Sequence, residues 1–313
     1  MSAATTPIYL CEPRGFCAGV ERAIQIVDLA LKKYGAPIYV RHEIVHNRWV
    51  VEDLRARGVV FVKEVEDVPD GGITIFSAHG ISEKVEQSAA LRDLPVIDAT
   101  CPLVTKVHME AQRYEATGRQ IILIGHEGHP EVEGTMGRIQ GQMLLVGSVD
   151  DVAHIEVRDP ESLSYVTQTT LSVDDTKNII DALVTRFPSI TGPDTRDICY
   201  ATQNRQNAVR ELQGKTEVLI VVGSVNSSNS NRLRDLGEEM GMRAYLIDDA
   251  RALHPEWLVG NPSVGITAGA SAPESLVEEV VRSVQSLGHY HVELLSYKKE
   301  STVFKLPPQL TGS

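Results

Sequence analysis

The chain has 313 residues, 42% of them hydrophobic, and a formal net charge of -12 at pH 7. This length and apolar fraction provide for a large core and predict two or three domains. The acidic charge and the absence of any Lys/Arg-rich run argue against a surface for nucleic acid or anionic membrane, because both require a basic footprint.

The N-terminal sequence lacks a basic segment followed by an apolar run of signal-peptide length, and no later run approaches the roughly 20 apolar residues of a membrane helix. We therefore expect a cytoplasmic protein without a membrane partner. The cytosol keeps thiols reduced, which argues against a disulfide framework and leaves metal binding, catalysis or burial for the cysteines. These are Cys11, Cys17, Cys101 and Cys199.

Short β-branched runs alternate with amphipathic stretches along the chain. Runs that begin at Pro37, Ile121 and Val218 are typical of strands, and segments 20–33 and 276–287 are typical of helices. The alternation predicts an α/β fold with mainly parallel strands. The order of elements repeats three times at intervals of about one hundred residues, which predicts three similar small α/β domains.

Each copy is expected to open with a strand, a cysteine loop and a helix, in IYLCEPRGFCAGVERAI, PVIDATCPLVTKVHMEA and DICYATQNRQNAVREL. Cys17, Cys101 and Cys199 therefore take equivalent places. A second strand in each copy leads to a polar loop, and a fourth ends in a hydroxyl-rich or His-bearing turn. Loops at the carboxyl ends of parallel strands build ligand sites, so a pseudo-threefold trefoil of the copies would bring these loops to one central cavity.

Turn residues near Leu94 to Val96 and near Pro193 to Thr195 separate the copies. We therefore predict a first repeat at 7–95, a second at 96–194, a third at 195–287 and a C-terminal tail at 288–313.

Three thiolates, one from each copy, are the ligands expected for a [4Fe-4S] cluster whose fourth iron lacks a protein ligand. A single cysteine is often just a small buried hydrophobe, but equivalent placement in three copies disfavours that explanation. A zinc site is the other metal candidate, although none of the loops contains the C-x-x-C pair common in structural zinc sites. Cys11 lies within the first expected strand, and we expect it to pack in the core.

Donors suited to phosphate oxygens gather in the predicted strand-end loops. The run Ser227, Ser228 and Asn229 precedes an expected helix, whose N-terminal amides also favour anions. Ser271 lies before a helix expected to start at Pro273, where it would take the N-cap position. Ordinary helix capping is the alternative for the Ser/Asn run, but the set as a whole predicts a diphosphate pocket. Five histidines fall in these loops: His42, His46, His79, His126 and His129.

Glu131 is the carboxylate nearest to His129 in its loop, and Thr169 and Thr170 follow the fourth strand of the same copy. A carboxylate, a hydroxyl and an imidazole in one dry cavity can pass protons to a departing hydroxyl. A solvated loop charge is the alternative for Glu131, and the sequence favours neither.

Nine motifs follow one another from Pro13 to about Glu274: PRGFCAGVERAI, RHEIVHN, FSAHG, DATCPLVTKVH, GHEGHPEVEGT, TQTTLSVDDT, ICYATQNRQ, VGSVNSSNSNRL and TAGASAPE. In this order they resemble the family of 4-hydroxy-3-methylbut-2-enyl diphosphate reductase, the last enzyme of the methylerythritol phosphate route to isoprenoids.

The resemblance implies a trefoil of three α/β domains around a central cluster, which would be bound by Cys17, Cys101 and Cys199. The substrate hydroxyl would lie on the unique iron, and two electrons with loss of water would give isopentenyl and dimethylallyl diphosphates. Glu131, with Thr169 and His129, would deliver protons, and a ferredoxin or flavodoxin would supply electrons. The residues implied to bind the substrate are His46, His79, His129, Thr169, Ser227, Ser228, Asn229 and Ser271.

Two other functions fit three cluster ligands. A non-redox dehydratase would use the open iron only to polarise a hydroxyl and would need no electron donor. An iron-sulfur sensor would turn over no allylic diphosphate, and the acidic charge disfavours one that binds DNA.

Overall fold

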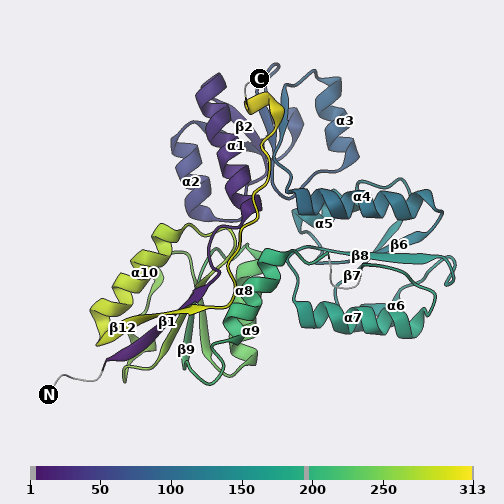
Figure 1. The fold of residues 1–313 in the computed structure, drawn as a ribbon. Helices are drawn as coiled ribbons and strands as arrows, with labels where there is room; N and C mark the ends of the chain where they lie inside the picture. Colours follow the sequence, from purple (N-terminus) through teal and green to yellow (C-terminus); the bar gives the residue numbers. More distant parts are fainter. Residues whose placement is uncertain (1–4, 194–196, 312–313) are drawn as a thin grey trace. The chain divides into compact units, whose positions relative to one another are not determined.

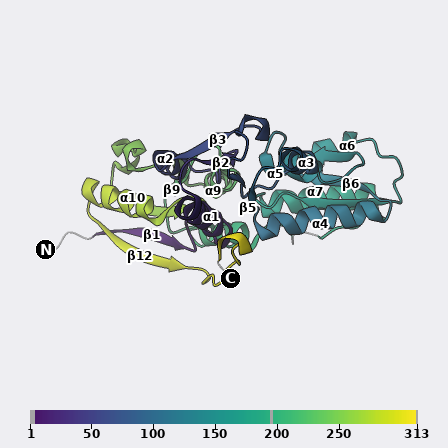
Figure 2. The same ribbon diagram turned by 90° about the horizontal axis from the view of Figure 1, so that it is seen from above.

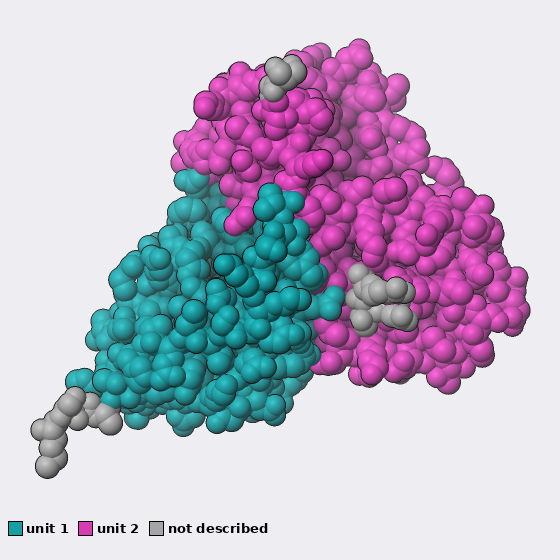
Figure 3. Space-filling view, viewed as in Figure 1, with its two compact units in different colours: residues 1–20, 46–53, 200–303 teal, residues 21–45, 54–199, 304–313 magenta. Residues whose placement is uncertain are grey.

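The computed structural model describes residues 5–193 and 197–311. Its named strands form three sheets, and every strand pairing within the described residues is parallel (Figures 1 and 2). The predicted α/β class is therefore confirmed. The chain divides into two compact units, which are described separately (Figure 3). Unit 1 comprises Met1–Val20, His46–Asp53 and Tyr200–Val303, and unit 2 comprises Glu21–Val45, Leu54–Cys199 and Phe304–Ser313.

Unit 1 is built on one five-stranded sheet of order β10-β9-β11-β1-β12. The central strand β9 reads VLIVV and is buried along its whole length, as expected for a parallel strand covered on both faces. Helix α10 packs on one face, and α8 and α9 pack on the other. The strands are β1 (Thr6–Glu12), β9 (Val218–Val222), β10 (Arg243–Ile247), β11 (Val264–Ala268) and β12 (Tyr290–Ser296), and the helices are α8 (Tyr200–Arg210), α9 (Ser228–Glu239) and α10 (Glu274–Leu287).

Unit 2 contains a four-stranded sheet of order β3-β2-β4-β5 and a three-stranded sheet of order β7-β6-β8. Residues of α4 and α5 cover one face of the three-stranded sheet, and residues of α6 and α7 cover the other. The strands are β2 (Ile38–Arg41), β3 (Val59–Val62), β4 (Thr74–Phe76), β5 (Val96–Asp98), β6 (Gln120–Ile124), β7 (Met143–Val146) and β8 (Leu163–Thr167). The helices are α3 (Glu83–Leu91), α4 (Pro102–Ala116), α5 (Pro130–Met136), α6 (Val149–His154) and α7 (Val173–Arg186).

Helices α1 (Ala18–Tyr34) and α2 (Arg48–Ala56) begin in unit 1 and continue into unit 2. Short 3-10 helices also occur. They are η1 (Val65–Asp67), η2 (Ala250–Ala252), η3 (Pro255–Leu258) and η4 (Pro308–Leu310). No helix among the described residues is long and apolar enough to cross a membrane.

The threefold repetition of elements is confirmed by the strand order. Each sheet places the third strand of its repeat at one edge, the second beside it and the fourth next, as in β10-β9-β11, β3-β2-β4 and β7-β6-β8. The strand that leads into a cysteine loop, the first of its repeat, pairs with a fourth strand: β1 with β11, and β5 with β4. Beside β8, an isolated parallel bridge joins Ser164 to Thr191.

Among the described residues of this segment, the strand expected at the start of the third copy does not form. Residues 197–199 form a turn, and α8 begins directly after them at Tyr200. The Asp197 carboxylate accepts from the Thr167 amide at 3.4 Å, Ile198 packs into the core with residues of β8, and the Cys199 amide donates to the Thr169 carbonyl. These contacts attach the segment without a strand ladder. The predicted boundary near Pro193 to Thr195 falls partly on residues 194–196, outside the described residues, and the domain limits stay a prediction.

The C-terminal tail contains a strand that periodicity did not predict. β12 pairs with β1 over seven residues, from Thr6 opposite Tyr290 to Glu12 opposite Ser296. It is an edge strand in which only Tyr290 is buried, and it begins two residues after Gly288, which ends α10.

Candidate active site

The three cysteines are attached by the same backbone contact. The amide of Cys17 donates to the Ala270 carbonyl at 3.1 Å, that of Cys101 to Ala78 at 3.0 Å, and that of Cys199 to Thr169 at 3.0 Å. Each acceptor lies two residues beyond the last residue of β11, β4 or β8. The predicted equivalence of the cysteine loops is therefore a physical one, because the backbone of each loop is bonded just beyond the end of the fourth strand of a repeat.

Each of these cysteines directly precedes a helix: α1 begins at Ala18, α4 at Pro102 and α8 at Tyr200. The positive end of a helix dipole favours a thiolate over a thiol. All three side chains are partly exposed and form no disulfide. The donor set is thus three accessible sulfurs at helix N-termini, which suits an iron-sulfur cluster.

Cys11 differs from the other three cysteines. It lies in β1, is fully buried, and its thiol donates to the Ala208 carbonyl. Burial raises the pKa of this thiol to about 12, which keeps it protonated. The prediction that Cys11 packs in the core is confirmed. Within the described residues, no group of three or more His, Cys, Asp or Glu side chains is arranged to hold a metal ion.

Glu131 lies in the first turn of α5, where Pro130 and the N-cap residue His129 start the helix. Its side chain is buried, so the alternative of a solvated loop charge is wrong. Thr169 donates to it twice, from its amide to Oε1 at 2.7 Å and from its hydroxyl to Oε2 at 3.0 Å. Burial raises the pKa of Glu131 to about 7, the two bonds from Thr169 oppose the rise, and the charge of Asp197 adds to it.

His129 lies beside Glu131 and close to His79. The Glu131 amide donates to Nδ1 of His129 at 3.1 Å, so a neutral His129 carries its proton on Nε2. The rings of His79 and His129 are 6.0 Å apart between centroids and nearly perpendicular. The Ser77 hydroxyl lies 3.3 Å from Nδ1 of His79. Unit 2 thus brings together two imidazoles and a protonatable carboxyl.

Ser227 is the N-cap of α9, and its hydroxyl accepts from the Ser230 amide at 3.3 Å. Ser228 and Asn229 are the first two residues of the helix rather than residues before it, which corrects the predicted position of the run. Capping therefore explains Ser227 in part. It does not explain Asn229, whose amide nitrogen and oxygen are both buried without a hydrogen-bond partner in the structure.

Ser271 is not the N-cap of α10, which corrects the sequence-based assignment. Pro273 takes that position, and its ring nitrogen and side chain offer no capping bond. The Ser271 hydroxyl instead donates to the backbone carbonyl of His46 at 2.7 Å. Its contact therefore fixes the loop that carries His46.

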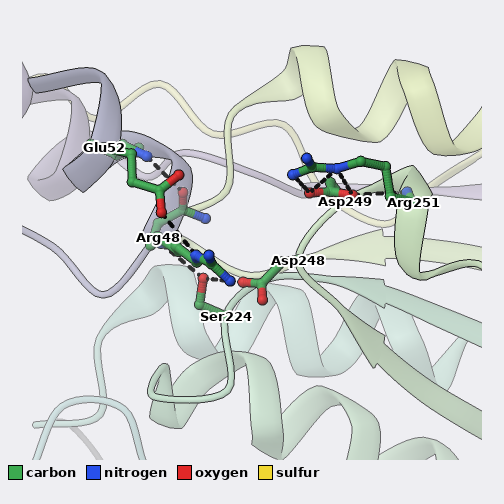
Figure 4. A network of polar contacts seen from close by, with 8 residues as sticks. Arg48, Glu52, Ser224, Asp248, Asp249 and Arg251 are labelled. Atoms are coloured by element: carbon green, nitrogen blue, oxygen red, sulfur yellow. Dashed lines mark hydrogen bonds and ion pairs between the residues drawn. The ribbon is translucent and has the colours of Figure 1, made fainter. Parts of the chain in front are cut away.

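A second serine holds the same loop from the end of β9. The hydroxyl of Ser224 accepts from the Arg48 amide at 2.9 Å and donates to Asp248 at 2.6 Å (Figure 4). The Arg48 side chain pairs with Glu52 at 2.9 Å on the exposed face of α2. Sequence analysis missed Ser224, although it lies in the predicted polar loop. The close-up also shows a separate exposed pair, Asp249 with Arg251.

Unit 2 also contains a buried acidic residue that sequence analysis missed. Asp197 pairs with Lys106 at 3.2 Å. Burial raises the pKa of Asp197 to about 6, Glu110 adds to the rise, and Lys106 opposes it. Its place two residues before Cys199 was the only signal in the sequence.

The predicted site residues divide between the two units (Figure 3). Unit 2 carries Cys101, Cys199, His79, His129, Glu131 and Thr169, and unit 1 carries Cys17, His46, Ser227, Ser228, Asn229 and Ser271.

Comparison with known proteins relates nearly the whole chain to one family. The family described as LytB protein matches residues 8–285. A 4-hydroxy-3-methylbut-2-enyl diphosphate reductase of Hahella chejuensis is 60% identical over 307 residues, covering 97% of each chain. The protein of Bordetella pertussis that bears the same name is 58% identical over 311 residues, covering 99% of this chain and 96% of its own.

Solved structures agree with the sequence comparison. The structure of E-1-hydroxy-2-methyl-but-2-enyl-4-diphosphate reductase from Plasmodium falciparum matches with a TM-score of 0.94 at 38% identity, covering 98% of both chains. A second reductase, described as the terminal enzyme of the non-mevalonate pathway, matches with a TM-score of 0.64 at 32% identity, covering 90% of this chain and 99% of that one. The chain therefore belongs to the LytB family of 4-hydroxy-3-methylbut-2-enyl diphosphate reductases.

Proposed function

We propose that this protein reduces (E)-4-hydroxy-3-methylbut-2-enyl diphosphate to isopentenyl and dimethylallyl diphosphates, the last step of the methylerythritol phosphate pathway. The substrate takes up two electrons and two protons, its allylic C–O bond breaks, and water leaves. The observation that carries the proposal is Glu131, a buried carboxyl that is hydrogen-bonded to Thr169 and whose pKa is raised to about 7. It lies in a chain that matches these reductases over nearly its whole length.

Membership of the LytB family implies an iron-sulfur cofactor. We propose that it is one [4Fe-4S] cluster held by Cys17, Cys101 and Cys199, with no protein ligand on the fourth iron. The support is the shared backbone contact of the three loops and their accessible sulfurs at helix N-termini. When bound, such a cluster supplies the electrons one at a time together with a Lewis-acidic iron.

The proposed ligands of the substrate diphosphate are hydrogen-bond donors. In unit 1 the unpartnered amide of Asn229 and the first amides of α9, behind the Ser227 cap, suit anionic oxygens. In unit 2 the neutral His129 ring carries its proton on Nε2, because Nδ1 accepts from the Glu131 amide, and we propose that this N–H donates to the diphosphate. The remaining proposed contacts are His46, His79, Thr169, Ser228 and Ser271.

Glu131 is the proposed proton donor. The Thr169 amide can only donate, so Oε1 must stay an acceptor. The carboxyl proton is therefore placed on Oε2, which faces the Thr169 hydroxyl. When Oε2 carries the proton, Glu131 donates to the Thr169 hydroxyl oxygen. The Thr169 hydroxyl then donates its own hydrogen to a substrate oxygen. Thr169 thereby passes the proton of Glu131 on, while His129 starts the helix that holds Glu131 in place.

Electrons are proposed to come from a ferredoxin or flavodoxin, one at a time. The test is an anaerobic assay with the allylic diphosphate and a reduced one-electron donor, followed by chromatographic identification of the products. Formation of both five-carbon diphosphates only in the presence of the donor supports the proposal. Water loss without a donor indicates the dehydratase, and no conversion by cluster-loaded protein indicates the sensor.

A further inference from the structure

An arginine of α8 joins the Cys17 loop to the C-terminal segment. Arg205 is completely buried, and its guanidinium donates to the Gly15 carbonyl at 2.7 and 3.2 Å and to the Phe16 carbonyl at 3.3 Å. It also pairs with Glu300 at 3.2 and 3.3 Å and donates to the Ala201 carbonyl at 2.9 Å. The loop that carries Cys17 is thus held, through one fork of donors, to a carboxylate 283 residues further along the chain.

Glu300 is itself fixed by further bonds. The side-chain amide of Asn204 donates to its Oε1 at 2.9 Å. Just before it, the Tyr297 amide donates to the Glu12 carbonyl at 2.8 Å, and the Asn207 amide donates to the Tyr297 hydroxyl at 3.0 Å. All of these residues belong to unit 1. The segment that follows β12 is therefore hydrogen-bonded to Glu12, just before the Cys17 loop, and joined to the loop itself through Arg205.

A second arginine repeats this arrangement in unit 2. Arg22, in α1, donates to the Thr100 carbonyl at 3.0 Å and to the Lys305 carbonyl at 2.7 Å. Thr100 directly precedes Cys101, as Phe16 directly precedes Cys17.

We propose that the C-terminal segment 297–305 braces two cysteine loops through Arg205 and Arg22, and that these arginines are positioning residues for cluster retention. The inference rests on the proposed function, since it assumes that Cys17 and Cys101 hold the cluster. A charged donor fork suits this task because one side chain binds a loop carbonyl and the brace at once. The family match covers residues 8–285, so the segment 297–305 lies beyond it, whereas Arg22 and Arg205 lie within it.

Substitution of Glu300 tests the brace in the full-length protein. Glu300→Gln keeps the shape of the side chain but removes the charge that Arg205 faces. We expect iron to leave the anaerobically loaded protein for a chelator roughly 10-fold faster than from wild type, the lower end of the effect of residues that orient metal ligands. Arg22→Lys should do the same, because a lysine is a point donor that cannot reach the Thr100 and Lys305 carbonyls together.

Matched controls separate bracing from general destabilisation. Glu239→Gln removes a charge from a carboxylate whose two oxygens both accept from the buried Arg232, and Arg57→Lys changes an arginine paired with Asp28. Both controls should release iron at the wild-type rate. The cluster-free forms of the controls, of Glu300→Gln and of Arg22→Lys should all have the thermal unfolding midpoint of cluster-free wild type. Wild-type retention by Glu300→Gln and Arg22→Lys, or equal loss from the controls, would overturn the brace alone. A wild-type protein that binds no iron would overturn the proposed function and the brace with it.

Discussion

Thr169 donates two hydrogen bonds to the buried carboxylate of Glu131, one from its amide at 2.7 Å and one from its hydroxyl at 3.0 Å. The same threonine accepts from the amide of Cys199 at 3.0 Å. A single residue, two positions beyond the end of β8, therefore contacts both a proposed cluster ligand and the proposed proton donor. Thr169 therefore links the position of the proposed cluster ligand to that of the proposed proton donor within unit 2.

Replacement of Glu131 by Gln should abolish most turnover without loss of the cluster. Glutamine fills the same buried space but carries no transferable proton, so we expect kcat to fall by about 10²- to 10⁴-fold with little change in substrate affinity. Steady-state kinetics and anaerobic iron analysis check this result. Glu133→Gln is the matched control, because Glu133 is an exposed carboxylate on the same helix. Unimpaired turnover by Glu131→Gln would remove Glu131 from the mechanism.

Turnover should also depend on pH through Glu131. Burial raises its pKa to about 7, and the donor is the protonated form, so kcat should decline as pH rises above this value. The Thr169 hydroxyl stabilises the carboxylate and lowers the pKa, while Asp197 raises it. Thr169→Val should therefore lower kcat, because the hydroxyl that passes the proton is lost, and should move the alkaline limb of the remaining activity to higher pH. A limb at the same pH in Glu131→Gln as in wild type would assign it to another group.

Asn229 should contribute directly to substrate binding. Its buried amide has no partner within the described protein, so a substrate oxygen or hydroxyl that meets it gains a hydrogen bond without displacing another. Asn229→Ala should raise the dissociation constant by roughly 10- to 150-fold, which corresponds to about 1.5–3 kcal/mol for a bond to a charged group. Calorimetry with the diphosphate checks this value. Asn178→Ala, at an exposed position on α7, should bind as wild type does, and an equal loss there would count against a specific contact.

Much of the fold was predictable because it repeats. Parallel strands buried on both faces leave uniform β-branched runs, so the strands at Val218 and Ile121 were found from sequence, as were helices α1 and α10. The cysteine loops were found because three similar segments place a thiol between a strand and a helix. The shared backbone contact to the end of a neighbouring strand confirms that equivalence.

The features that sequence missed depend on partners far along the chain. Ser271 was placed at a helix N-cap, but its hydroxyl binds the His46 carbonyl, 225 residues away. Neither Arg205 nor Glu300 lies in a pattern that predicts their pairing, and the burial of Asp197 arises from α4 and β8 packing around it. Periodicity reports which face of an element is apolar, and it carries no information about which distant polar group will satisfy a side chain.

Iron and sulfide content of anaerobically prepared protein tests the central claim most directly. We predict about four iron and four sulfide per chain, with Mössbauer spectra in which one iron changes its environment when the diphosphate substrate is added. Cys17→Ser, Cys101→Ser and Cys199→Ser should each lose most of the iron, whereas Cys11→Ala should keep it, because Cys11 is a buried protonated thiol. Wild-type protein without iron, or full iron content after loss of any one of the three thiols, would contradict the account.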